Sequence, residues 1–368
     1  MHDKPDIHAA RQVALMTDLR SLTPEELREA LAPLNLPDYR AKQIFDWLQR
    51  RGVQSAAEIT NLPKALRTRL EENFCISSCE IIRRQESSSG ARKYQLRLHD
   101  GELIESVVMR YAYGYSVCVS TQAGCKMACA FCASGQHGFM RDLTSGEMLA
   151  QIHAAQKDLS ESISHIVLMG MGEPLDNYDH TVKFLRLASH PEGLNIGQRK
   201  ISISTCGLVP QMDRLAGERL GATLSVSLHA PNDELRSRLM PVNRAYPIAE
   251  LLSACGRYAK ATGRRISFEY ALLRDVNDSP EHARELAGRL KGKGIFQIPC
   301  HVNLIPANPV PELGFHRSRP EQVRDFQGIL EQSGLAVTVR RSLGRDIDAA
   351  CGQLAACGQL RKGGIPCE

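Results

Sequence analysis

The sequence has neither a long hydrophobic run nor an apolar N-terminal leader. No run of about 18 apolar residues occurs in its 368 positions, and the opening segment Met1-His2-Asp3-Lys4-Pro5 is mostly polar. A transmembrane helix and a signal peptide both need such an apolar segment. We therefore expect a cytoplasmic, monomeric protein with no membrane partner. The formal net charge of +5 selects no class of ligand by itself.

What the chain does contain is cysteine, with 12 residues. In a reducing compartment a cysteine cluster is more often a metal or catalytic site than a disulfide framework. Cys125, Cys129 and Cys132 form a C-x3-C-x2-C triplet in a loop that follows a strand-like run. Three thiolates at this spacing can hold three corners of a 4Fe-4S cluster and leave one iron open. Enzymes known for this triplet use the open iron to bind and cleave S-adenosylmethionine.

Structural zinc is the alternative for the same cysteines. Zinc prefers a closed set of four ligands, commonly two paired knuckles. The nearest candidates to complete such a set are Cys118 and His137, and they would give a lopsided site. The ligand count and spacing therefore favour the cluster.

The first 78 residues are expected to form a small helical domain. Thr23-Pro24-Glu25-Glu26 has the signature of a helix start, and later apolar periodicities run through Ile44 and through Leu66 to Phe74. The segment from Arg40 to Leu70 is rich in lysine and arginine. Such a basic excess fits contacts with RNA phosphates, although a solvated helical surface would look similar.

Residues 79–115 alternate apolar and polar side chains around an Asp100-Gly101 turn, which predicts a β-hairpin extension. In residues 116–348 strand-like runs then alternate with amphipathic helices. The runs expected after the cysteine loop are 165–169, 200–205, 223–228, 266–273, 301–305 and 336–340. Six βα units predict an α/β fold with a partial (β/α)6 TIM-like barrel, whose functional residues gather at the C-terminal strand ends. Residues 349–368 are expected to form a C-terminal loop.

Five long motifs follow one another along the chain. They are Cys125 to Cys132, Met169 to Pro174, Ser227 to Asp233, Asn303 to Pro306 and Gly344 to Leu354. From about Pro37 to Leu354 the sequence resembles the radical S-adenosylmethionine enzymes of the RlmN type. These enzymes methylate adenine C2 in 23S rRNA, at the peptidyl transferase centre, and in tRNA, next to the anticodon. Phe268-Glu269-Tyr270, Pro174 and Pro306 look more like this branch than like the related C8 methyltransferases, which confer antibiotic resistance.

The resemblance implies a mechanism with two reactive cysteines. One S-adenosylmethionine methylates Cys351, and a second is cleaved at the cluster to a radical that activates the S-methyl group for addition to C2. Cys118 then attacks the Cys351 sulfur, which forms a transient disulfide and releases the base. Glu105 matches the proton acceptor. An electron donor such as flavodoxin or ferredoxin is also implied.

The resemblance further implies contacts with S-adenosylmethionine from Gly172, Glu173, Ser204, Ser227, Leu228, His229 and Asn308. Without it, Glu105 would be interpreted as a solvent-facing carboxylate, Cys118 as a buried strand cysteine and His229 as a core histidine. A zinc-stabilised RNA-binding protein without catalysis is the alternative from another class. Chemistry on an adenine requires the base to leave its stack, so looped or single-stranded RNA is the expected target.

The C-terminal segment departs from the family pattern in one respect. Ala-Ala-Cys-Gly-Gln-Leu occurs as residues 349–354 and again as 355–360, so Cys357 has the same local neighbours as Cys351. Only Cys351 follows Gly344-x-Asp346-Ile347-Asp348 at the family's spacing. We therefore expect Cys351 to be the methyl carrier.

Overall fold

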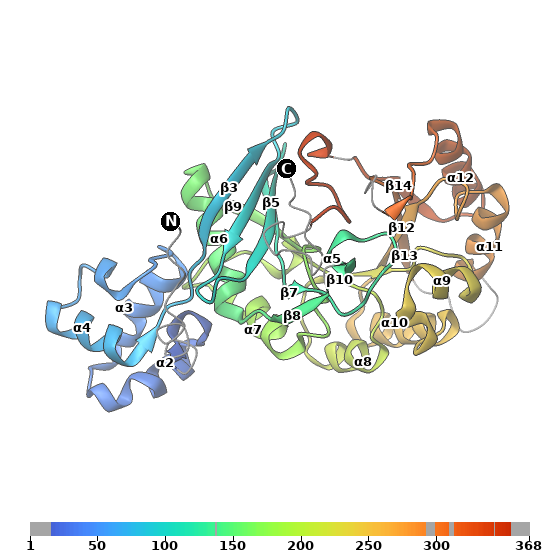
Figure 1. The fold of residues 1–368 in the computed structure, drawn as a ribbon. Helices are drawn as coiled ribbons and strands as arrows, with labels where there is room; N and C mark the ends of the chain where they lie inside the picture. Colours follow the sequence, from blue (N-terminus) through green and yellow to red (C-terminus); the bar gives the residue numbers. More distant parts are fainter. Residues whose placement is uncertain (1–15, 137, 292–298, 309–312, 342, 355–368) are drawn as a thin grey trace.

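The computed structural model describes residues 16–136, 138–291, 299–308, 313–341 and 343–354. Its centre is a 10-stranded sheet of order β14-β13-β12-β11-β10-β9-β6-β5-β4-β3 (Figure 1). The parallel part consists of β6 (Gly114–Cys118), β9 (Ile163–Leu168), β10 (Ile201–Thr205), β11 (Thr223–Ser227), β12 (Ile266–Leu272), β13 (Cys300–Pro306) and β14 (Ala336–Val339). Within the described residues no pairing joins β14 back to β6, so the barrel is open.

The predicted partial barrel is confirmed. All six strands expected after the cysteine loop are present in the expected order, and β6, which precedes the loop, lies parallel to β9. The principal helices between the strands are α6 (Ser145–Leu159), α7 (Tyr178–Ala188), α8 (Val209–Gly217), α9 (Asp233–Leu239), α10 (Ile248–Thr262), α11 (Pro280–Lys291) and α12 (Pro320–Gln332). Every residue of β12 is buried, as expected for a strand of a parallel sheet that is covered on both faces.

Two helices begin with capping boxes, and the one at Thr23 confirms the predicted helix start. The Thr144 hydroxyl accepts a hydrogen bond from the Glu147 amide, and the Glu147 carboxylate accepts one from the Thr144 amide, at the start of α6. Thr23 and Glu26 form the same pair at the start of α2. Each pair satisfies two amides that would otherwise have no partner within the helix.

The N-terminal region consists of α2 (Pro24–Leu31), α3 (Asp38–Gln49) and α4 (Lys64–Asn73). Phe74, expected to continue the last helical periodicity, instead begins β2 (Phe74–Cys75), which pairs with β1 (Thr17–Asp18). The buried Arg20 guanidinium donates to the carbonyls of Ser77 at 2.7 Å and Leu48 at 2.9 Å, and contacts His153 of α6. One buried cation thus fastens this region to the barrel.

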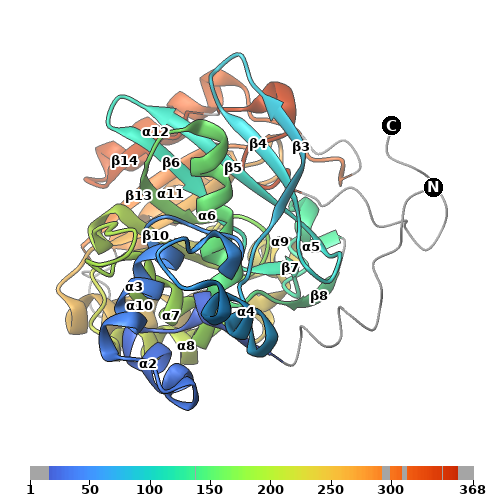
Figure 2. The same cartoon turned by 90° about the vertical axis from the view of Figure 1, so that its left-hand side faces the viewer.

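The antiparallel extension consists of β3 (Glu80–Glu86), β4 (Arg92–Arg97) and β5 (Leu103–Tyr111), and it continues the sheet beyond β6 (Figures 1 and 2). The predicted turn is present, with Gly101 at φ +90°, a conformation that favours glycine. Because side chains alternate along a strand, Glu105, Val107, Met109 and Tyr111 share one face of β5. None of the helices in the described ranges is long and apolar enough to cross a membrane.

Candidate active site

A cavity at the C-terminal ends of the parallel strands brings most of the predicted site residues together. Those lining it are Cys125, Cys129, Cys132, Gly172, Glu173, Ser204, Ser227, His229, Asn308 and Cys351. Three predicted residues do not line it, namely Glu105, Cys118 and Leu228. The Leu228 side chain is 1% exposed and packs in the hydrophobic core. The cavity thus joins the cysteine triplet to the polar strand ends, as predicted from the order of the motifs.

The cysteine loop is fixed by backbone hydrogen bonds. It lies between β7 (Gln122–Gly124) and α5 (Ala133–Gln136), and β8 (Phe139–Asp142) pairs with β7. The Cys125 amide donates to the Gly138 carbonyl at 2.8 Å, and the Ala130 amide donates to the Leu239 carbonyl at 2.9 Å. A Cβ on Gly135 would lie 3.1 Å from the Cys129 nitrogen, so glycine allows α5 to pack closely on the loop.

The three thiols fit a cluster better than a single metal ion. All three are free, and in the described part of the chain no three His, Cys, Asp or Glu side chains are placed to hold one metal ion. Zinc needs converging ligands, whereas a cube distributes its thiolates over separate irons. Cys118 does not line the cavity of the triplet, and His137 lies outside the described residues. Cys118 therefore does not complete a zinc set with the triplet.

Two buried oxygen atoms in the same cavity have no hydrogen-bond partner within the described residues. They are Glu269 Oε2 and Asn308 Oδ1. Buried polar atoms are nearly always paired, and these two line the cavity, so both can accept hydrogen bonds from a ligand bound in it. The ammonium and ribose hydroxyls of S-adenosylmethionine are such donors, and this cavity therefore fits that molecule. The sequence reasoning missed Glu269 as a site residue, although it lies on the strand predicted from 266 to 273.

The Gly172-Glu173 turn is held by the protein itself. The Glu173 carboxylate accepts hydrogen bonds from the amides of Leu175 at 3.0 Å and Cys206 at 2.8 Å, while burial raises its pKa. Gly172 has φ +98°, and a Cβ there would lie 2.7 Å from the Gln122 nitrogen. Close packing against β7 therefore requires this glycine, whether or not a ligand approaches it.

His229 is a neutral hydrogen-bond donor at the cavity wall. Its Nδ1 accepts a hydrogen bond from the Ala271 amide at 2.9 Å, which assigns the ring proton to Nε2. Burial lowers the pKa of His229 to about 3. The ring also packs edge to face on Phe131, with centroids 5.0 Å apart. His229 is thus both a packed core residue and part of the cavity lining.

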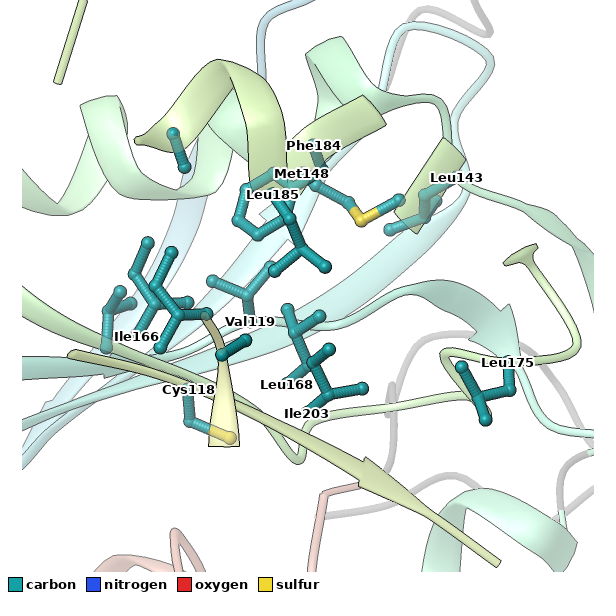
Figure 3. Close-up of a cluster of buried hydrophobic side chains, with 14 of the residues drawn as sticks. Cys118, Val119, Leu143, Met148, Ile166, Leu168, Leu175, Phe184, Leu185 and Ile203 are labelled. Carbon is teal, nitrogen blue, oxygen red and sulfur yellow. The ribbon is translucent and has the colours of Figure 1, made fainter. Parts of the chain in front are cut away.

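Cys351 lines this cavity and also a second, smaller one. The second cavity is lined by Cys118 and Met109 on one side and by Arg340 on the other. Cys118 lies at the end of β6, and its sulfur points away from Val119, Leu185 and Phe184 (Figure 3). Burial raises the pKa of Cys118 to about 12, and the positive charge of Arg340 opposes that rise.

The loop that carries Cys351 is anchored on its N-terminal side by the β3–β4 hairpin. The Asp346 carboxylate accepts hydrogen bonds from the Ser87 hydroxyl at 2.5 Å and the Ser88 amide at 2.9 Å. These bonds lower the pKa of Asp346 to about 2. Because the pKa of Asp346 is lower in the folded state than in the unfolded state, the stability that its hydrogen bonds contribute is fully present above the unfolded-state pKa. That contribution is lost as the pH falls through the folded-state pKa of about 2. The anchor is therefore intact at neutral pH.

The other side of the loop is anchored directly behind the triplet. The Ala133 amide donates to the Gly352 carbonyl at 2.8 Å, and the Ser134 hydroxyl donates to the Leu354 carbonyl at 2.6 Å. Both donors belong to α5, which begins immediately after Cys132. Cys351 is thus held between the hairpin and the helix of the cysteine loop. Cys357 lies outside the described residues.

Glu105 is not the solvent-facing carboxylate that its strand alone would suggest. It is 4% exposed, and its carboxylate pairs with Lys93 at 3.0 Å. Lys93 Nζ also donates to the Asp348 carbonyl at 3.1 Å. One lysine therefore connects Glu105 to the loop that carries Cys351.

Arg340 is a second residue that the sequence reasoning missed. It follows β14, lines both cavities and contacts Met169 Sδ at 3.3 Å. The charge that Cys351 carries as a thiolate raises the pKa of Arg340. The sequence did contain a signal for Arg340, because it is the last residue of the strand predicted from 336 to 340 and functional residues are expected at such strand ends.

Comparisons with known proteins agree with this site. Residues 119–287 match the model of the Radical SAM superfamily, and residues 17–76 match the ribosomal RNA large subunit methyltransferase N-terminal domain. A protein of Pelotomaculum thermopropionicum named "Probable dual-specificity RNA methyltransferase RlmN" is 54% identical over 92% of this chain and 91% of its own length. A protein of Geobacillus kaustophilus with the same name is 47% identical over 93% of each chain. A radical SAM methyltransferase from Sphaerobacter thermophilus has a TM-score of 0.88 at 47% identity, covering 92% of this chain and 99% of that one.

Replacing one cysteine of the triplet is expected to abolish cluster binding. We expect Cys129→Ala, after anaerobic reconstitution, to lose its iron, its sulfide and the cleavage of S-adenosylmethionine, because two thiolates hold a cube poorly. Cys75→Ala, in β2, is the control and should bind iron as the wild type does. Full iron content in Cys129→Ala would refute the assignment.

Removing the hairpin anchor is expected to loosen the loop around Cys351. We expect Asp346→Ala to raise amide hydrogen exchange in residues 343–354 about tenfold, since hydrogen bonds to a charged group are lost. S-methylation of Cys351 should fall in parallel. Asp325→Ala, at an exposed position of α12, is the control. Unchanged exchange in Asp346→Ala would show that the loop is held by other contacts.

Proposed function

The chain belongs to the RlmN family of dual-specificity RNA methyltransferases, within the radical SAM superfamily. From this premise we propose that it methylates C2 of adenine in 23S rRNA and in tRNA, with Cys351 as the methyl carrier. The observation that carries the proposal is that Cys351 lines both the cavity of the cysteine triplet and the cavity that contains Cys118. One sulfur can therefore be reached from the cofactor side and from the substrate side.

The larger cavity, which contains the cysteine triplet, would bind the cofactors. Cys125, Cys129 and Cys132 would hold a 4Fe-4S cluster, and Glu269 and Asn308 would accept hydrogen bonds from S-adenosylmethionine. When bound, these groups supply the methyl group and the radical that adenine C2 requires, since this electron-poor carbon cannot act as a nucleophile. The apolar walls, which include Phe131 and Met240, keep water away from that chemistry.

Cys118 would release the methylated adenine from Cys351. Its thiolate would attack the Cys351 sulfur, so that a sulfur–sulfur bond forms while the bond from sulfur to the methylene carbon breaks. The electron pair goes to that carbon, which takes up a proton and becomes the new methyl group. Glu105, fixed by Lys93, would accept the proton that leaves C2, and the unpaired electron of the adduct would pass to the bound cluster. An electron donor such as flavodoxin or ferredoxin would reduce the cluster before the cofactor is cleaved, and the disulfide must be reduced before the next turnover.

The RNA is proposed to enter by the smaller cavity. This cavity is lined by β5 and β6 on one side and by Arg340 and Arg341 on the other, where the sheet is not closed. A flipped adenine of looped or single-stranded RNA could meet Cys351 there. The basic N-terminal helices would bind the surrounding phosphates.

The products distinguish this proposal from its alternatives. Mass spectrometry of adenosines from RNA treated with the reconstituted enzyme should find 2-methyladenosine in both 23S rRNA and tRNA substrates. A product methylated at C8 would instead identify the related resistance activity. No methylated product from a cluster-loaded protein would contradict the proposal.

The resolving role of Cys118 predicts a trapped intermediate. We expect Cys118→Ala to form the bond between Cys351 and RNA but not to break it, so that the purified protein carries covalently attached RNA. Nuclease digestion and mass spectrometry of the peptide containing Cys351 would detect the adduct. Cys79→Ala replaces another buried cysteine and should remain free of RNA. A fully active, RNA-free Cys118→Ala protein would remove this role.

The duplicated hexapeptide leads to a prediction about the carrier. The hydrogen bonds from α5 and the hairpin hold the loop around Cys351, and Cys357 lies six positions further on. We expect Cys357→Ala to be active and Cys351→Ala to be inactive. Peptide mapping should find S-methylcysteine at position 351. Methyl on the peptide containing Cys357, or substantial turnover by Cys351→Ala, would show that the second copy serves as a carrier.

A further inference from the structure

Three aromatic rings meet at the turn between β5 and β6. The rings of Tyr111 and Tyr113 are stacked, with centroids 4.9 Å apart and planes 10° apart. Tyr113 also contacts His165 of β9, with centroids 4.5 Å apart and planes 57° apart. Even so, Tyr113 remains 60% exposed. One exposed aromatic residue needs no explanation by itself. What matters for ligand binding is whether the turn that carries Tyr113 is anchored and where that turn lies relative to the cavities.

The turn that presents Tyr113 is fastened to the neighbouring strand. Gly114 has φ +118°, and a Cβ there would lie 2.6 Å from the Ser164 hydroxyl oxygen, so the hairpin packs directly on β9. The same hydroxyl donates to the Tyr115 carbonyl at 2.9 Å. Tyr113 is thus presented on a fixed support. A pre-ordered aromatic side chain loses little entropy on binding a ligand.

The stack lies beside the smaller cavity. The Tyr111 hydroxyl donates to Met109 Sδ at 3.6 Å, and Met109 lines that cavity together with Cys118 and Cys351. The charge of Arg340, across the opening from β5, acts on the hydroxyls of both tyrosines. The stack therefore extends from the cavity of the reactive cysteines to the surface of the protein.

We propose that Tyr113, supported by Tyr111, is a stacking platform for one unpaired base next to the target adenine of the substrate RNA. The proposal rests on the proposed function. When an adenine leaves its stack to reach Cys351, its neighbours in the strand lose a stacking partner. An aromatic ring can replace that partner for any base, because every base has a π-face. Exposed Arg341 and Lys200, whose charge reaches His165, provide positive charge for the adjoining phosphates.

A cycle of protein and RNA changes tests this contact. The RNA is a hairpin with the target adenine in its loop, used intact or with an abasic nucleotide on the 5′ or the 3′ side of the adenine. Binding to the full-length protein is measured for wild type, Tyr113→Ala and Tyr113→Phe. Ile82→Ala is the control, because Ile82 of β3 is an exposed large hydrophobic side chain, at 38%, outside the proposed RNA contacts.

We expect Tyr113→Ala to raise the Kd for intact RNA about tenfold, equivalent to about 1.4 kcal/mol, and Tyr113→Phe to bind as the wild type does. At one of the two neighbouring positions, the abasic nucleotide should raise the Kd of the wild-type protein by the same factor of about ten. With Tyr113→Ala, the abasic RNA and the intact RNA should have the same Kd. With Ile82→Ala that abasic nucleotide should still cause its full loss. In turnover, the effect of Tyr113→Ala should appear in KM, with kcat unchanged.

Three results would overturn the platform. The first is wild-type affinity of Tyr113→Ala for intact RNA. The second is that, at both neighbouring positions, the increases in Kd caused by Tyr113→Ala and by the abasic nucleotide multiply when the two changes are combined. Such independent effects would show that the ring and the base do not touch. The third is an effect on kcat with unchanged KM. Failure of the proposed function would look different, since the wild type itself would leave intact RNA unmethylated at C2.

Discussion

The position of one sulfur atom constrains the rest of the structure. As the proposed methyl carrier, Cys351 must be accessible from the cavity of the cysteine triplet and from the cavity of Cys118, and it lines both. Such a position cannot tolerate a mobile loop, because a displacement of even 1 Å costs much of the rate of a positioned reaction. The loop is accordingly bound on one side by serines of the β3–β4 hairpin and on the other by the first turn of α5.

The antiparallel extension of β3, β4 and β5 does more than cover the barrel, because it holds the loop that carries Cys351 in place. Its β3–β4 turn binds Asp346, its strand β4 supplies Lys93 to the Asp348 carbonyl, and β5 places Glu105 beside that lysine. A buried ion pair adds little net stability, because desolvation offsets its attraction. Its value here is geometric. Lys93 fixes a carboxylate and a backbone carbonyl at once, so the proposed proton acceptor and the methyl carrier keep a constant relative position.

The sequence predicts the parts of this site that depend on local spacing. The cysteine triplet, the helix start at Thr23 and the ends of the predicted strands all lie within short segments whose pattern is diagnostic. Phe74 was assigned to a helix because periodicity alone does not register the pairing of β1 with β2. The contact expected from Leu228 stays a prediction for its backbone, because its side chain packs in the core.

The residues that sequence reasoning missed share a different property. Lys93 and the carbonyl it binds are 255 positions apart, and Arg340 contacts Met169 across 171 positions. Nothing in the local pattern of either segment distinguishes these cations from surface residues, which most lysines and arginines are. The sheet places both cations beside the loop that carries Cys351, since Lys93 lies on β4 and Arg340 follows β14. A charge removed from water requires an anionic or polar partner. Lys93 pairs with Glu105, and Arg340 lines the cavity that contains Cys118 and Cys351.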